Sequence, residues 1–200
     1  MALNTEENRE KLKSIFPGLE TDVHFSIQSP ETPEYNCIAW AMGFDDRWVD
    51  YSLDFDISRK KWWPDGVTRD FKPETLIEAF RQLKFVECED DRIEEGFDKV
   101  ALYKISPLTD PFTGIIVANE GWTHAARIIS NGVYHSKIGG LFDIYHRNGD
   151  LFEGTSYGEI YQYMKRKKED FAITEIIKNE ETSIDMPDDI FDIIAKMMLG

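Results

Sequence analysis

The sequence contains few cysteines, no long apolar run and no apolar leader, and each shortage narrows the possible functions. Two cysteines, Cys37 and Cys88, are too few for a disulfide framework, so both are expected to be reduced thiols. No apolar run reaches the length of about 18 residues that a membrane-spanning helix requires. The first residues are polar and charged, unlike a signal peptide. We therefore expect a cytoplasmic protein, unless a specialised secretion route exports it.

Basic residues are also scarce. Lysine and arginine total 23 against 38 acidic residues, which gives a formal net charge of −15 at pH 7. This charge argues against nucleic acid or anionic lipid as a partner, because both bind basic surfaces. It is compatible with a basic protein partner or a cationic peptide, and also with solubility alone. The four histidines form no motif with zinc-ligand spacing, so no metal or other cofactor is expected.

The chain is long enough for one domain with a full core, and 42% of its residues are hydrophobic. We predict a main domain over 1–168 and an acidic C-terminal extension over 169–200, which ends in an amphipathic helix that starts near Asp185. Caps and hydrophobic periodicity predict helices at 4–16, 73–84 and 157–168. Alternation and turn residues predict strands at 85–88, 99–105, 123–129, 133–138 and 141–146.

The segment that follows Pro33 has the capping residues of a short helix. Asn36 is a good N-cap residue, and the apolar run that follows it ends at Gly43, a typical C-cap. Cys37 would then lie in the first turn of a helix, where free backbone N–H groups and the helix dipole favour a thiolate. Two interpretations remain open at this point: Cys37 is a nucleophile, or it is a buried core residue.

A thiolate nucleophile needs a base, and the base needs a third group that holds its tautomer. His124 is the best candidate base, because it begins a strand and is followed by small residues. Asp143 is the best candidate for the third group, since a charge within an apolar strand needs a partner. His135 and Ser136 are the alternatives. The backbone N–H of Cys37 and the side chain of Asn36 are the candidate oxyanion donors.

These segments carry a resemblance. The blocks YNCIAWA (35–41), THAARII (123–129) and SKIGGLFDI (136–144) resemble an uncharacterised family of bacterial domains, over about Pro30 to Lys165. The order of the Cys and His segments is more distantly similar to that of papain-like peptidases of the NlpC type. This likeness implies an α+β papain-like fold, with N-terminal helices and the nucleophile helix packed on an antiparallel β-meander. It implies Cys37 and His124 as the catalytic pair. An NlpC-type pattern places the third residue at Ser136, and a transglutaminase-like arrangement favours Asp143.

Two functions are consistent with this sequence. The first is a cysteine-dependent acyl hydrolase or transferase that acts on a peptide or protein amide with Cys37, His124 and Asp143. The second is an inactive domain of the same kind, or an acidic immunity-type protein, that binds a basic protein partner. The substrate, the direction of transfer and the oligomeric state do not follow from the sequence.

Overall fold

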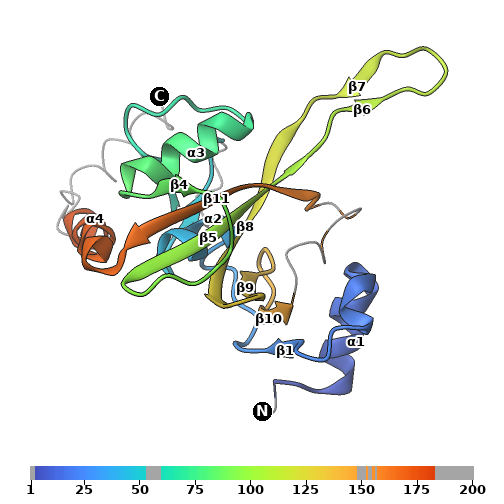
Figure 1. The fold of residues 1–200 in the computed structure, drawn as a ribbon, viewed down its shortest axis with the longest axis horizontal. Coiled ribbons are helices and arrows are strands. Elements are labelled where there is room, and N and C mark those ends of the chain that lie inside the picture. Colours follow the sequence, from blue (N-terminus) through green and yellow to red (C-terminus); the bar gives the residue numbers. More distant parts are fainter. Residues whose placement is uncertain (1–2, 53–59, 148–151, 153–154, 156, 183–200) are drawn as a thin grey trace, which may run out of the picture.

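The computed structural model describes residues 3–52, 60–147, 152, 155 and 157–182. Its main feature is an antiparallel seven-stranded β-sheet with the strand order β1-β10-β9-β8-β5-β11-β4 (Figure 1). The strands of this sheet are β1 (Ser26–Ile27), β4 (Val86–Cys88), β5 (Phe97–Ile105), β8 (Gly121–Ser130), β9 (Val133–Lys137), β10 (Asp143–Arg147) and β11 (Glu159–Lys167).

Within the described part of the chain the helices are few and short. They are α1 (Glu6–Ile15), η1 (Pro17–Glu20), α2 (Cys37–Met42), α3 (Pro73–Gln82), η3 (Lys168–Phe171) and α4 (Ala172–Thr182). The predicted papain-like fold is therefore wrong, because the described residues form mainly a large antiparallel sheet with few short helices. The element order alone suggested that fold, but strand pairing determines the architecture. Within the described residues, no helix combines the length and the apolar character needed to cross a bilayer.

Local signals located most elements correctly. The predicted helices near 4–16 and 73–84 are α1 and α3, and the three strands of the predicted meander are β8, β9 and β10. Thr5 caps α1 by accepting a hydrogen bond from the Asn8 N–H at 3.2 Å, while Pro73 occupies the first position of α3.

The helix predicted at 157–168 is wrong, since this segment forms β11. Ile160, Tyr161 and Tyr163 are β-branched or aromatic residues, which favour strands. The strand is also paired on both sides, with β5 and with β4. Tertiary pairing of this kind is not visible in the helical spacing of a single segment.

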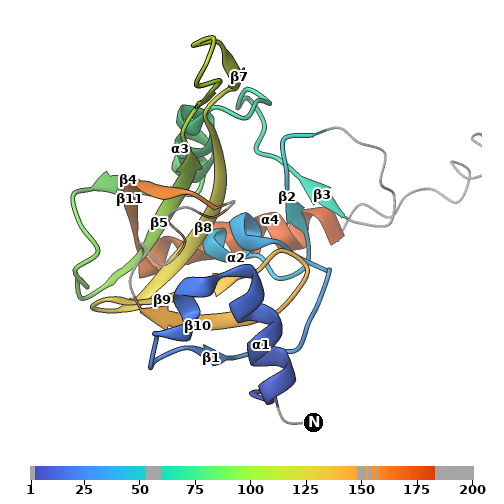
Figure 2. The ribbon, with the colours of Figure 1, turned by 90° about the vertical axis from the view of Figure 1, so that its right-hand side faces the viewer.

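The sheet separates two hydrophobic clusters. Side chains alternate between the faces of a strand, so neighbouring residues of β5 and β8 belong to different clusters. Figure 2 shows α2 near β8, and α1 near the end of the sheet that carries β1. The first cluster includes α2 and α3 residues with Val100, Leu102, Trp122, Ala125 and Met164. The second includes α1 and η1 residues with Ala101, Tyr103, Ala126, Tyr134, Ile144 and Phe152.

Two small sheets lie outside the main one. Strands β2 (Trp48–Val49) and β3 (Lys61–Trp62) pair in parallel. Strands β6 (Leu108–Thr109) and β7 (Ile116–Ala118) form an antiparallel hairpin, which projects away from the rest of the fold (Figure 1).

The segment after β11 contacts the end of α2. The Thr174 hydroxyl donates to the Met42 carbonyl at 3.3 Å and accepts from Arg166 at 3.0 Å. The helix predicted from Asp185 lies outside the described residues, and the division into 1–168 and 169–200 stays a prediction.

Candidate functional site

The start of α2 has the predicted cap. The Asn36 side-chain oxygen accepts from the Ala39 N–H at 3.0 Å, and its amide donates to the Val49 carbonyl at 2.9 Å. At the other end, Gly43 has a φ of 106°, and an added Cβ would lie 2.7 Å from the Phe171 ring. The helix limits are thus fixed by Asn36 and Gly43. The Asn36 amide nitrogen uses one of its two N–H donors on Val49, so its role as an oxyanion donor stays a prediction.

The sulfur of Cys37 lies against the backbone of β8. Its Sγ donates to the Thr123 carbonyl over 4.0 Å, and only 7% of the residue is exposed. Burial raises the pKa of the Cys37 thiol to about 11, although the backbone N–H groups of Ala125, Ile38 and Cys37 act in the opposite direction. The predicted helix-start amides are therefore present, but desolvation outweighs them. Cys37 is a neutral thiol at pH 7.

His124 is part of a buried chain of polar side chains. Its Nε2 lies 3.0 Å from the Ser136 hydroxyl, and the same hydroxyl lies 2.8 Å from Nε2 of His146. All three residues are fully buried. Burial, and secondarily the charge on His146, lowers the pKa of His124 well below its usual range, so the ring is neutral. Among the described residues, His124 Nδ1 has no hydrogen-bond partner.

Aromatic rings enclose this imidazole. The Tyr157 ring stacks on it at a centroid distance of 4.2 Å and an interplanar angle of 8°. Tyr103 and Phe152 meet it edge-on at 5.2 Å each. The Thr123 hydroxyl donates to the Tyr157 carbonyl at 2.5 Å, which fixes this aromatic cover to β8. Trp40 Nε1, His135 Nε2 and Asp143 Oδ1 are likewise buried without a hydrogen-bond partner among the described residues.

The structure brings Cys37 and His124 into neighbouring positions but does not join them. The sulfur contacts the backbone of Thr123 and Ala125, on either side of His124. Cys37 belongs to the first hydrophobic cluster, whereas the rings around the imidazole belong to the second. No hydrogen bond between Sγ and the imidazole is present among the described contacts.

Asp143 does not stand behind His124. Its carboxylate accepts a hydrogen bond from the Tyr35 hydroxyl at 2.8 Å, and its backbone N–H donates to Ser29 at 3.1 Å. It pairs across the strands with Lys137, whose ammonium donates to the carbonyls of Thr32 and Leu141. The strand charge thus has the partner that physical chemistry requires, but that partner is Tyr35 and not the imidazole.

Of the two alternatives, Ser136 is the residue that binds His124, while His135 faces elsewhere. The His135 ring contacts the Trp40 and Tyr145 rings at 4.9 Å and 4.6 Å. His146 was not selected from the sequence. Alternation along β8, β9 and β10 was the available signal, since His124, Ser136 and His146 fall on one face once the register is known.

Cys88 provides an internal comparison. It is partly buried, and its sulfur donates to the Asp90 carbonyl over 3.7 Å. Burial is the main reason that its pKa is raised, with Lys99 opposing and Glu94 adding to the shift. Both cysteines are free thiols.

The buried neutral His124 predicts a dependence of stability on pH. A histidine whose folded-state pKa is depressed binds protons more readily when unfolded, so its contribution is present above about pH 6.5 and is lost as the pH falls. Stability should therefore fall as the pH is lowered from 7 to 5. Urea denaturation should show that His124→Gln removes this part of the slope, whereas His24→Gln, at an exposed position, leaves it. Identical slopes for the parent and His124→Gln would contradict the assignment.

Comparison with known proteins identifies a family but no activity. A family model described as a domain of unknown function (DUF7689) matches residues 26–165. No curated protein and no solved structure matches the chain. In the described part of the chain, no group of three or more His, Cys, Asp or Glu side chains is arranged to hold a metal ion.

Proposed function

The chain belongs to the DUF7689 family of domains of unknown function, and we propose that it is a cysteine-dependent acyl hydrolase or transferase. One observation carries this proposal. The Cys37 sulfur lies beside the backbone that flanks His124, and the imidazole is tethered by Ser136 through Nε2 while Nδ1 is left without a partner. A base that is held through one ring nitrogen and open at the other is what a thiol nucleophile requires.

Before the reaction, the Cys37 thiol and the His124 imidazole are both uncharged. His124 Nδ1 takes the proton from the Cys37 thiol as the sulfur attacks the substrate carbonyl carbon. The imidazolium then gives this proton to the leaving amine, the C–N bond breaks and a thioester remains on Cys37. Water, or another amine, attacks the thioester to complete hydrolysis or transfer. Sγ belongs to the first hydrophobic cluster and the imidazole lies among rings of the second, so this scheme requires the His124 ring to turn toward the sulfur when the substrate binds.

Three backbone amides support the charged forms of this reaction. The N–H groups of Cys37, Ile38 and Ala125 lower the pKa of the thiol and would stabilise the thiolate as it forms. The Cys37 N–H, at the first position of α2, is also the natural donor to the oxyanion of the tetrahedral intermediate. Ser136, backed by His146, holds the imidazole tautomer.

The test uses p-nitrophenyl acetate, a small activated acyl donor, with release of p-nitrophenolate and mass spectrometry of the labelled peptides. We expect an acetyl thioester on Cys37, turnover that persists in Cys88→Ser, and its loss in Cys37→Ala. Equal acetylation of Cys37 and Cys88, with turnover unaffected by Cys37→Ala, would refute the proposal.

A second candidate function is binding of a basic protein, and the β6–β7 hairpin favours it. Leu108, Phe112, Ile115 and Ile116 are exposed on this projecting element, with Phe112 94% exposed. Exposed apolar clusters on soluble proteins commonly mark interaction sites. The net charge of −15 would attract a cationic partner. The acetylation assay discriminates, because a binding protein gives no preference for Cys37.

A further inference from the structure

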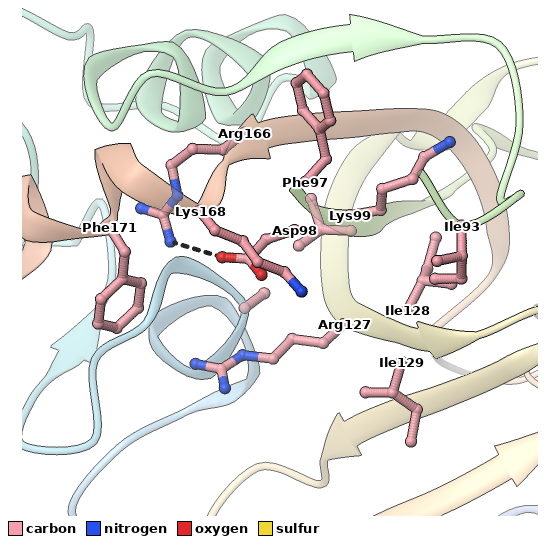
Figure 3. Close-up of a pocket in the computed structure, with 12 residues that line it drawn as sticks. Ile93, Phe97, Asp98, Lys99, Arg127, Ile128, Ile129, Arg166, Lys168 and Phe171 are labelled. Carbon is pink, nitrogen blue, oxygen red and sulfur yellow. Dashed lines mark ion pairs between the residues drawn. The ribbon is translucent and has the colours of Figure 1, made fainter. Parts of the chain in front are cut away.

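A second site lies at the far end of α2 from Cys37. A cavity of about 370 Å³ is lined by residues of β5, β8, β11 and η3, together with Ala41 of α2 and Ile93 of the loop before β5 (Figure 3). It shares no residue with the Cys37 and His124 site. What it binds is therefore independent of the proposed acyl chemistry.

Cationic side chains dominate the polar lining of this cavity. Arg127, Arg166 and Lys168 line it, against one carboxylate, Asp98. Lys99 also lines it, but its ammonium is occupied by the Arg92 carbonyl and by the carboxylates of Glu94 and Asp90. Within the lining, these three cations outnumber the single carboxylate, while Asp45 and Asp143 also act on the charge of Arg127.

Two of these cations have unused hydrogen-bond donors. Arg127 donates through Nε to the Trp40 carbonyl at 2.8 Å and lies over the Trp40 ring, and its terminal nitrogens make no hydrogen bond to a described residue. Lys168 is exposed and forms no ion pair with a described residue.

Arg166 is the buried member of the group, with only 2% of its surface exposed. One terminal nitrogen donates to Thr174, and the other lies 3.8 Å from Asp98 (Figure 3). Its Nε has no hydrogen-bond partner among the described residues. Burial lowers the pKa of Arg166 to about 10; Asp98 and Asp170 oppose this shift, and repulsion from Arg127 adds to it. A buried donor and a repelling pair of arginines would both be stabilised by a bound anion.

The remaining lining is apolar and partly open to solvent. Phe97, Phe171, Val100 and Ile128 line the cavity, while Ile93 and Ile129 are each 42% exposed. Large exposed aliphatic residues around a concave site are typical of ligand pockets, and the volume suits a small molecule.

We propose that this cavity binds a small organic anion, in which a carboxylate or phosphate group is carried on an apolar body. The oxyanion would lie between Arg127 and Lys168, with Arg166 behind them, since guanidinium groups match the geometry of carboxylate and phosphate oxygens. The apolar body would pack on the Phe171 ring and the two exposed isoleucines.

The test is isothermal titration calorimetry of the full chain with hexanoate, hexyl phosphate and hexan-1-ol. We expect at least one anion to bind at a single site at least tenfold more tightly than hexan-1-ol, and comparison of the two anions distinguishes a carboxylate ligand from a phosphate ligand. Binding of hexan-1-ol with equal affinity, or no binding of either anion, would overturn the proposal.

Matched variants locate the site. Lys168→Met and Arg127→Met should each weaken anion binding about tenfold, the loss expected for one charge-assisted contact. Lys167→Met changes the adjacent exposed lysine, which pairs with Glu169 and does not line the cavity, and should leave affinity unchanged. Because Lys168 is exposed, its variant should keep the melting temperature of the parent. Unchanged affinity in Lys168→Met and Arg127→Met would place the anion elsewhere and refute the assignment.

Discussion

Replacement of His124 by glutamine is expected to slow acetylation of Cys37 by about 100- to 10,000-fold, the usual contribution of a general base. Glutamine retains a polar group that can reach the Ser136 hydroxyl, 3.0 Å from the imidazole in the parent. It cannot accept and return the thiol proton. Because Cys37 is a neutral thiol with a pKa of about 11, little thiolate exists at pH 7 without this base. Initial rates with p-nitrophenyl acetate measure the effect.

The variant Ser136→Ala tests the role of the residue that positions His124 and leaves His124 itself in place. Ser136 touches His124 and His146 but not the sulfur in the described contacts, so it is a positioning residue. Its loss should slow acetylation by about tenfold and shift the pH dependence of the rate, because the tautomer is no longer held. His24→Gln is the matched control, since His24 is exposed. If His124→Gln and His24→Gln react at the same rate, His124 is not the base.

The sequence predicts α2 well because its limits are set locally. Asn36 supplies its own cap through the Ala39 N–H, and Gly43 adopts the left-handed conformation that ends the helix. The Asn131-Gly132 turn of the β8–β9 hairpin is similarly local, with Gly132 at a φ of 68°. Signals of this kind need only a few neighbouring residues.

Contacts between distant segments are what the sequence does not specify. The insertion of β11 between β5 and β4, and the pairing of β1 with β10, give a broad sheet in place of the expected papain-like arrangement. The burial of the Cys37 sulfur also depends on contacts between distant segments. The amides at the start of α2 favour a Cys37 thiolate as predicted, but the packing that desolvates the sulfur comes from β8 and from residues far along the chain.

In the candidate site, one contact follows from nearby residues in the sequence and another depends on distant segments. His124 and Ser136 were selected from one hairpin, and they do form a hydrogen bond. The inference that Asp143 needs a partner was also sound, but the partner, Tyr35, lies 108 residues away in the sequence. Choosing between Tyr35 and His124 requires the strand register, which places Asp143 opposite Lys137.

Replacement of Asp143 by alanine is expected to lower the free energy of unfolding by about 2–4 kcal/mol, which for a chain of this size lowers the melting temperature by about 5–15 °C. Asp143 is 3% exposed and Tyr35 is 8% exposed, so removal of the carboxylate leaves the Tyr35 hydroxyl buried without its acceptor. It also removes a negative charge that favours the protonated form of Lys137. Thermal and urea denaturation measure the loss, with Glu89→Ala as an exposed acidic control.

The same variant decides between the two roles considered for Asp143. A structural carboxylate bound by Tyr35 predicts that Asp143→Ala, at a temperature where it is fully folded, acetylates Cys37 within about threefold of the parent rate. Tyr35→Phe should then destabilise the fold in parallel, and the double variant should lose less than the sum of the two, because both single changes break one hydrogen bond. If the acetylation rate falls as much as in His124→Gln and the losses of stability are additive, Asp143 is instead the third residue that orients the imidazole.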